Sequence, residues 1–294
     1  MTSTPRVTVF GSLHYDIAVF GPARPRKGET VTGSAWHPKS GGKGGNQAVS
    51  AAKTGIATSM IGAVAADDFG RFLIDNLARK GVDHRFVARD ARRATGMSVA
   101  IFDDEGDYGA VIVSGSNLDL GESHLEAASE VLAETAILVL QNEIPDAANV
   151  LAARRVKAAG GLVLLNAAPA RPLSDALKSL VDILVVNAIE AEMLAGVDVV
   201  ETLEGALSAA RILKSSYPQV IVTAGGAGAA AVDADGREIT INPVKVKVES
   251  THGAGDEFIG MLAAQTARGL SLDRALADAN KAAAHLVATP ESER

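Results

Sequence analysis

The sequence predicts an α/β fold built on a mostly parallel sheet, and two observations support this. Short runs rich in aliphatic and β-branched residues recur at 7–10, 59–64, 137–140, 162–165, 183–186 and 220–223. Several are apolar at consecutive positions, as in strands buried on both faces. Amphipathic stretches that favour helix lie between them, at 46–53, 69–80, 146–159, 173–179, 190–194 and 203–214. Strands and helices that alternate at this spacing are typical of a parallel α/β sheet.

Two regions break this alternation and predict a second, smaller sheet. Residues 29–39 and 96–114 read as strands with alternating side chains, and Asp103-Asp104-Glu105-Gly106 forms a turn inside the second region. We expect both regions to project from the main body.

The last third of the chain predicts an edge hairpin followed by two helices. Residues 230–232 and 238–241 flank an Asp235-Gly236 turn, which is typical of a hairpin at the edge of a sheet. The helices are expected at 257–268 and 272–287.

Composition narrows the class of protein. The 294 residues suffice for one large or two small domains, and the absence of cysteine excludes disulfides and thiolate metal sites. The net charge of −7, without clustered lysine and arginine, argues against a nucleic-acid partner. The N-terminus does not resemble a signal peptide, and no window is apolar enough for a membrane span. We therefore expect a cytoplasmic protein with a small-molecule partner.

Two glycine-rich loops do not match the common nucleotide fingerprints. The loop GGKGGNQA at 41–48 fails the Walker pattern, because Lys43 is followed by Gly44, and it lacks the third glycine of G-x-G-x-x-G. The stretch TAGGAGAAAV at 223–232 fits a looser dinucleotide pattern but leads into the predicted hairpin instead of a helix. Either loop still allows a backbone to approach a ligand closely.

The stretch STHGAGD, residues 250–256, predicts an anion-binding helix start. Gly253, Ala254 and Gly255 leave backbone N–H groups uncovered just before a helix, which suits an oxyanion or a phosphate. Asp256 stands in the first turn, where the helix dipole favours its ionised form. It is suited to accept a proton from an attacking hydroxyl, and the alternative is a plain helix cap.

Together these stretches resemble the ribokinase-like carbohydrate kinases of the pfkB family. GGKGGNQA is similar to the first signature of that family and THGAGDEF to the second. Other similar pieces follow in order: GSLHYD (11–16), LQNEIP (140–145), NAAPA (166–170), VNAIEAEML (186–194) and TAGGAG (223–228). The resemblance implies one three-layer αβα domain over residues 1–294, with a small β-sheet lid from roughly 12–40 and 96–116. It also implies ATP-dependent phosphorylation of a hydroxymethyl group.

The resemblance implies a role for each motif residue. Asp256 would be the catalytic base, and the amides of Gly253, Ala254 and Gly255 would form the anion hole. The residues implied to hold the sugar are His14, Asp16, Gly41, Gly42, Lys43, Asn46 and Glu143. Two alternatives stay open: Glu143 as an acid at a helix start, and Lys43 as a solvated loop lysine.

A further set is implied to bind the nucleotide and magnesium. The nucleotide residues are Asn187, Thr223, Gly225, Gly228 and Asn280, and Glu190 is implied to bind Mg²⁺ through water. The alternative for Asn187 and Glu190 is a capping box, with both side chains serving the helix start. The lid is implied to exclude water and to form a homodimer contact.

Departures from the family pattern limit these implications. Ser250 replaces an aspartate that helps ribokinase to bind an activating monovalent cation, and the glycine-containing loop expected after ATPESER is missing. Both argue against activation by potassium. His14 replaces an asparagine in the sugar contact, which leaves the acceptor sugar open, and His252 either packs under the nucleotide loop or tunes Asp256.

We expect a Mg-ATP-dependent kinase that phosphorylates a primary hydroxyl of ribose or of a related pentose or hexose. A nucleoside kinase of the same fold is the first alternative, although aromatic residues at 4% offer few platforms for a base. A sugar-binding sensor with impaired catalysis is the second.

Overall fold

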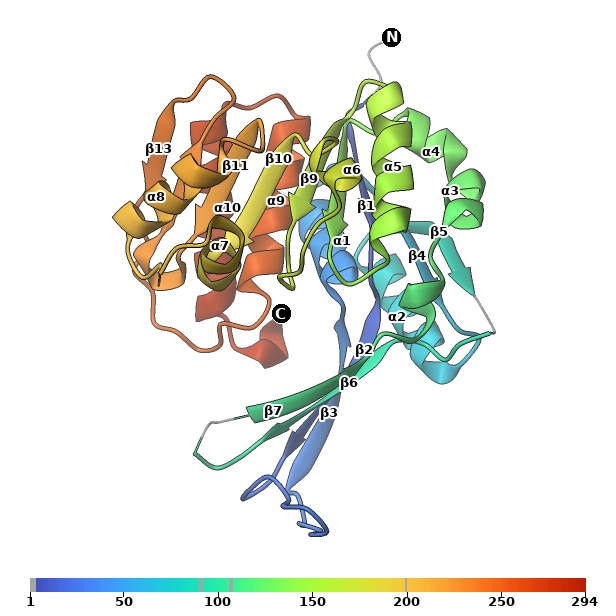
Figure 1. The fold of residues 1–294 in the computed structure, drawn as a ribbon. Coiled ribbons are helices and arrows are strands. Elements are labelled where there is room, and N and C mark those ends of the chain that lie inside the picture. The colour runs from blue at the N-terminus through green and yellow to red at the C-terminus, as the bar shows by residue number, and fades with distance from the viewer. Residues whose placement is uncertain (1–3, 90–91, 106–107, 199) are drawn as a thin grey trace.

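The computed structural model describes residues 4–89, 92–105, 108–198 and 200–294, and these ranges contain two sheets (Figure 1). In the described residues the large sheet has nine strands in the order β13-β12-β11-β10-β9-β8-β1-β4-β5. Its strands are β1 (Arg6–Phe10), β4 (Ala57–Val64), β5 (Asp83–Arg89), β8 (Ile137–Gln141), β9 (Leu162–Asn166), β10 (Ile183–Asn187), β11 (Gln219–Thr223), β12 (Ala229–Val232) and β13 (Glu238–Ile241). The pairs from β5 to β11 are parallel, and only β12 and β13 join antiparallel.

Helices cover both faces of the large sheet, and each face has its own apolar core. One core packs α3 (Glu122–Ala127), α4 (Ser129–Ala133), α5 (Asp146–Ala158), α6 (Asp175–Lys178), α7 (Ala188–Ala195) and α8 (Leu203–Leu213). The other packs α1 (Lys43–Lys53), α2 (Asp68–Arg79), α9 (Ala254–Ala267) and α10 (Leu272–Ala288). The predicted three-layer αβα architecture with a mostly parallel sheet is therefore confirmed.

The small sheet projects from one end of the main body, as Figure 1 shows. In the described chain it has four strands in the order β3-β2-β6-β7. Its strands are β2 (His14–Phe20), β3 (Ala35–Gly41), β6 (Met97–Phe102) and β7 (Tyr108–Val113). The second predicted strand region, 96–114, is confirmed as the β6–β7 hairpin, while Gly106 of its predicted turn lies outside the described residues.

The prediction of one strand over 29–39 is wrong in its first half. Strand β3 begins at Ala35, because the Ser34 N–H already donates to Phe20 O at 2.7 Å and ends the loop after β2. At Gly33 a Cβ would lie 2.8 Å from Phe20 O, so only glycine lets the two backbones approach there. Strands β2 and β5 were not predicted.

The helix starts at the glycine motifs lie earlier than predicted. Helix α1 begins at Lys43 and α9 at Ala254, each three residues ahead of the predicted 46 and 257. Both glycine motifs therefore run directly into a helix, whose first-turn N–H groups have no partner within the helix. The remaining helical segments are short 3₁₀ turns: η1 (Gly115–Asp119), η2 (Gly225–Ala227) and η3 (Glu291–Glu293). Within the described ranges, no helix is both long enough and apolar enough to cross a membrane.

Candidate active site

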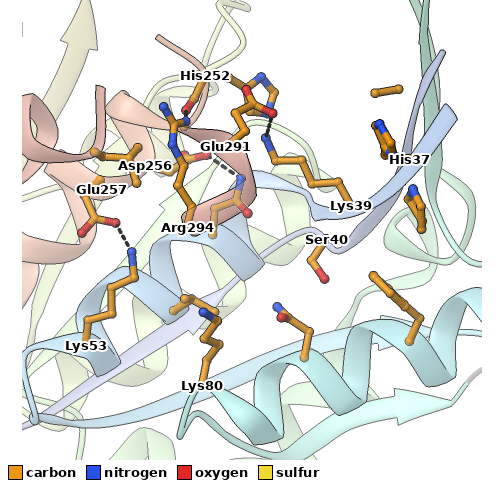
Figure 2. Close-up of a pocket in the computed structure, with 18 of the residues that line it drawn as sticks. His37, Lys39, Ser40, Lys53, Lys80, His252, Asp256, Glu257, Glu291 and Arg294 are labelled. Carbon is orange, nitrogen blue, oxygen red and sulfur yellow. Dashed lines mark hydrogen bonds and ion pairs between the residues drawn. The ribbon is translucent and has the colours of Figure 1, made fainter. Parts of the chain in front are cut away.

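Two cavities meet at Asp256. The larger, about 510 Å³, lies between the small sheet and helices α1, α2 and α9, and Figure 2 shows its lining. The smaller, about 210 Å³, lies at the ends of β10 and β11 against the starts of α7 and α9. Asp256 and Gly253 line both cavities, so the start of α9 separates the two spaces and is open to each.

The Asp256 carboxylate is buried and held by two amide groups of α1. Oδ2 accepts from Asn46 Nδ2 at 2.9 Å, and Oδ1 accepts from Gln47 Nε2 at 2.9 Å. Burial raises the pKa of Asp256, while the nearby Lys43 ammonium and both amide hydrogen bonds oppose that rise. A fixed carboxylate with a raised pKa has the position and basicity that a general base needs.

Gln47 is a site residue that the sequence reasoning missed. Its Oε1 accepts from Gln141 Nε2 at 2.8 Å, which leaves its own Nε2 pointing at Asp256. Gln47 and Gln141 are both fully buried. A glutamine on the glycine-rich side of a buried helix was a usable signal, because a buried amide needs partners.

The glycine loop is built so that α1 can pass close to β2. Gly42 has φ +83°, and a Cβ on it would lie 2.7 Å from His14 N. A Cβ on Gly41 would overlap the Asp16 carboxylate. The backbone thus requires glycine at position 42, while Gly41 leaves room for the Asp16 carboxylate beside the start of α1.

His14, Asp16 and Glu143, which the sequence predicts to bind the sugar, lie together, but none of them is among the residues that line the larger cavity. His14 Nδ1 lies 3.9 Å from Glu143 Oε2, and the buried His14 Nε2 has no hydrogen-bond partner among the described residues. Asp16 Oδ1 accepts from Ser98 Oγ at 2.5 Å. Burial raises the pKa of Asp16, and the Ser98 hydrogen bond opposes the rise. Ser98, on β6, was not predicted as a site residue.

Glu143 serves the start of α1 and not that of α5. It lies in the turn before α5, and its Oε2 accepts from the Lys43 N–H at 2.9 Å and from the Ser12 hydroxyl. The alternative interpretation of Glu143 as an acid at its own helix start is therefore wrong. Ser12 is a further contact that the sequence did not reveal.

The smaller cavity carries the groups expected around phosphates. Lys43, Asn187, Glu190 and Thr223 line it together with Gly253 and Gly255. Lys43 was predicted among the sugar residues, but its side chain lines this second cavity while its N–H binds Glu143. Burial raises the pKa of both Glu190 and Asp256, and the nearby Lys43 ammonium opposes the rise at each.

Asn187 and Glu190 form the capping box that the sequence offered as their alternative role. The Asn187 N–H donates to Glu190 Oε2 at 2.9 Å, and the Glu190 N–H donates to Asn187 Oδ1 at 2.9 Å. Burial raises the pKa of Glu190. Both side chains still line the cavity, so capping and ligand binding are compatible.

The donor set around Glu190 fits a metal that is held mainly by water and phosphate. The described residues contain no group of three His, Asp or Glu side chains placed to ligate a metal ion. A hard cation such as Mg²⁺ keeps several waters and uses one or two carboxylates plus substrate phosphates. Glu190, beside Lys43 and the Gly255 backbone, matches that arrangement.

Three predicted nucleotide residues lie outside both cavities. Gly225 and Gly228 have positive φ values in the turn after β11, and a Cβ on Gly228 would overlap Ile241 O. Asn280 Nδ2 donates to Asn242 O at 2.9 Å, which ties α10 to the segment after β13. Their nucleotide role stays a prediction.

Of the three residues predicted to form an anion hole, two line the smaller cavity, and the anion-binding role stays a prediction. Gly253, with φ +81°, and Gly255 line the smaller cavity. The Ala254 N–H instead donates to Thr251 O at 3.3 Å, and Ala254 is not among the lining residues.

Comparison with known proteins assigns nearly the whole chain to one family. A family model described as pfkB family carbohydrate kinase matches residues 4–293. The chain belongs to this family. As a pfkB-family member it is a carbohydrate kinase, and the enzyme class predicted from the sequence is confirmed.

Its similarity to ribokinases extends over nearly the full length. The chain is 32% identical over 278 residues to the ribokinase of Haemophilus influenzae, covering 95% of this chain and 90% of that protein. It is 33% identical over 282 residues to the ribokinase of Mus musculus, covering 95% and 87%. The structure of Arabidopsis thaliana ribokinase complexed with ribose and ATP matches with a TM-score of 0.91 at 30% identity, covering 97% of this chain and 93% of that one. The predicted ribokinase-like fold is confirmed.

Proposed function

We propose that this pfkB-family kinase transfers the terminal phosphoryl group of ATP to a primary hydroxyl of ribose or of a related pentose or hexose. One observation carries the proposal: Asp256 lines both cavities, so a single carboxylate faces the acceptor on one side and the phosphoryl donor on the other. The ribokinases among its relatives, one of them bound to ribose and ATP, support this choice of substrates.

The sugar is held at the small-sheet side. Asp16 and Glu143 accept from sugar hydroxyls, and Asn46, already bonded to Asp256, fixes the acceptor next to the base. His14, with its unpartnered Nε2, offers one more polar contact. These groups hold the primary hydroxyl within reach of Asp256.

Asp256 removes the proton from that hydroxyl as the oxygen attacks the terminal phosphorus of ATP. A bond forms between sugar oxygen and phosphorus, the bond to the bridging oxygen breaks, and ADP leaves. The proton resides on Asp256, and the Lys43 ammonium and the Gly253 and Gly255 N–H groups face the charge on the transferred group. Mg²⁺, when bound near Glu190, neutralises phosphate charge.

We propose that the small sheet acts as the lid over the sugar. It supplies one wall of the larger cavity, with Ala18, Phe20, His37 and Lys39. A closed lid keeps water from competing with the sugar for the phosphoryl group.

The exposed edge of the lid supports a homodimer. Val111, Ile112 and Val113 on the outer strand β7 are exposed by 69%, 59% and 51%, and an open apolar edge strand favours pairing with another strand. Light scattering after size-exclusion chromatography checks this, because Ile112→Lys should convert a dimer to a monomer. A monomeric wild type contradicts it. The cytoplasmic location also stays a prediction.

A nucleoside acceptor is the second candidate, and the structure gives it one observation. The rings of Phe20, His37 and Phe72 line the larger cavity, although the sequence has few aromatic residues. Such rings can stack on a base.

Initial rates of ADP release across ribose, deoxyribose, fructose, adenosine and inosine test the proposal. We expect turnover with one or more of the sugars and little with the nucleosides. Turnover with nucleosides alone would identify the protein as a nucleoside kinase. A wild type that releases no ADP with any acceptor, yet melts at a higher temperature with a sugar, is a sensor and contradicts the proposal.

A further inference from the structure

Arg294 directs all three of its donor nitrogens at backbone carbonyls. Nε donates to Thr289 O at 2.9 Å, Nη1 to His252 O at 2.8 Å and Nη2 to Ser250 O at 2.9 Å, beside the larger cavity (Figure 2). Arginines on a protein surface commonly pair with carboxylates, as Arg237 does with Asp273. Arg294 instead applies its charge to three backbone carbonyl oxygens.

A nearby acid, Glu291, binds other partners. Glu291 Oε1 accepts from Ser250 Oγ at 2.6 Å, and Oε2 accepts from Lys39 Nζ at 3.2 Å. This hydrogen bond explains why a serine suits position 250. An ionised aspartate there would have no proton to donate to Glu291. Glu291 thus joins the small sheet to residue 250, while the Arg294 guanidinium binds only the three carbonyl oxygens among the printed contacts of the described residues.

Backbone carbonyl oxygens grouped around one positive charge resemble a binding site for a monovalent cation. Their negative ends repel each other unless a positive charge lies between them, and rings of backbone carbonyls are what coordinate K⁺ in proteins. A guanidinium is always charged, is weakly hydrated and presents its donors in a fixed plane. It can therefore fill such a ring without taking an ion from solution.

The carbonyl of His252 sets the direction of the next amide. In a planar trans peptide the C=O of one residue and the N–H of the following residue point in opposite directions. Holding His252 O against Arg294 therefore aims the Gly253 N–H the other way, and Gly253 lines the smaller cavity. A hydrogen bond to the carbonyl also polarises the peptide and strengthens its N–H as a donor.

The backbone freedom of Gly253 makes the hydrogen bond between Arg294 and His252 O necessary. Its φ is +81°, in the left-handed region, and a residue without Cβ has other backbone conformations within reach. No described backbone or side-chain acceptor binds its N–H, so nothing on the cavity side fixes the peptide before a phosphate arrives. The hydrogen bond from Arg294 to His252 O then keeps the Gly253 N–H directed toward the smaller cavity.

We propose that Arg294 is a positioning residue whose guanidinium serves as a built-in monovalent cation and orients the Gly253 amide toward the transferred phosphoryl group. The inference rests on the proposed phosphoryl transfer. A wild type without turnover contradicts that function, whereas the tests below use a wild type that turns over.

Steady-state kinetics of Arg294→Ala test the proposal at a constant ionic strength of about 0.1 M. Removing one oxyanion donor costs roughly 10²–10³-fold in kcat, and an amide that is misaimed but still present should cost roughly 10–100-fold. The KM for the sugar should stay within about threefold, because the sugar contacts are untouched. Added K⁺ or guanidinium should restore most of the lost kcat, while tetramethylammonium, which is too large, should not.

Two further variants complete the design. Arg294→Lys keeps a point charge and should show an intermediate kcat with a weaker response to K⁺, which also covers the case in which the alanine variant does not fold. Arg268→Ala is the matched control, since Arg268 also donates to a backbone carbonyl, Thr54 O, at 2.7 Å, at the other end of α9. It should keep wild-type kcat and show no cation response.

Three results would overturn the proposal. One is a folded Arg294→Ala enzyme with wild-type kcat. Another is a loss of kcat that neither K⁺ nor guanidinium restores. The third is a wild type that K⁺ itself activates severalfold, because the ring would then hold an ion that Arg294 does not replace.

Discussion

The two cavities that meet at Asp256 differ in what builds their walls. The smaller is lined by the ends of β9, β10 and β11 and the starts of α1, α7 and α9, all belonging to the main body. The larger takes part of its wall from β2 and β3 of the small sheet. Inner strands of the main sheet such as β8 and β10 are almost entirely buried, whereas β3 is exposed along most of its length.

In the proposed function, this contrast separates the cavity that would bind phosphate from the cavity that would bind the sugar. The phosphate side is fixed by the packing of the main body, while the sugar side depends on where the small sheet sits. Contacts such as the stacked rings of Tyr15 and Phe69, with centroids 3.9 Å apart, and the Lys39–Glu291 ion pair hold that sheet. Changes on the phosphate side should therefore lower kcat, and changes on the sugar side should raise the KM for the sugar.

Asp256→Asn should have the largest effect. The amide cannot take the proton of the hydroxyl, so kcat should fall by roughly 10²–10⁴-fold, while sugar binding measured by calorimetry changes by less than about threefold. Asp273→Asn is the matched control, an exposed aspartate in the first turn of α10, and should leave kcat unchanged. Unchanged phosphorylation by Asp256→Asn would remove Asp256 from the role of base.

Lys43→Met should lower kcat by roughly 10²-fold and also change the pH profile. The base works deprotonated, so the rate falls as the pH drops through the pKa of Asp256. Burial raises that pKa above the ordinary 3.8, and the wild-type acid limb should lie above pH 3.8 accordingly. The Lys43 ammonium opposes the rise, so its loss should move the acid limb to still higher pH.

The control for this profile is Lys157→Met, which removes a lysine that pairs with Asp182 on the surface. Its pH profile should match that of wild type. An acid limb of Lys43→Met that stays in place, or moves to lower pH, means that the ammonium does not act on the base.

Ser98→Ala tests the sugar side. Asp16 loses the hydroxyl that holds it and that opposes the rise of its pKa, so the carboxylate is both less fixed and more easily protonated. The loss of one such hydrogen bond should raise the KM for the sugar by roughly 3–10-fold, with kcat within about twofold. Ser34→Ala, in the loop between β2 and β3, is the control. A change in kcat alone would break the division between the two cavities.

Lys39→Met should have the smallest effect. Its ion pair with Glu291 is half exposed, so its loss should raise the KM for the sugar about two- to threefold. High salt should raise the wild-type KM toward the value of the variant, because exposed pairs are screened. Lys247→Met, which removes an exposed pair with Glu249, should change nothing. If salt affects wild type and Lys39→Met equally, the ion pair does not hold the small sheet.

Much of the fold could be predicted because the strands of the main sheet are apolar at consecutive positions, as in ILVLQ and ILVVN. Strand β5, DHRFVAR, was missed because it lies at the sheet edge and carries charged residues. Strand β3 was misplaced because its start is set by the contact between Gly33 and Phe20, which involves a neighbouring strand.

The site was predicted where its residues lie in motifs and missed where a contact joins distant segments. Asp256, Asn46 and Glu143 belong to recognisable stretches, and the structure brings them together. The hydrogen bonds of Gln47 to Asp256, of Ser98 to Asp16 and of Arg294 to His252 span 209, 82 and 42 residues, which no local pattern can pair. Lys43 was assigned to the sugar because its motif is a sugar motif, although its side chain lines the other cavity.

The most direct test of the account compares D-ribose with 5-deoxyribose in the presence of Mg-ATP, with ADP release and ³¹P NMR of the products as readouts. We predict one ADP for each phosphorylated ribose, with the new phosphate on the primary hydroxyl. For 5-deoxyribose we predict binding without ADP release above the rate seen with no acceptor. Equal ADP release with both sugars, or a phosphate on a ring hydroxyl, would contradict a base at Asp256 that is aimed at a primary hydroxyl.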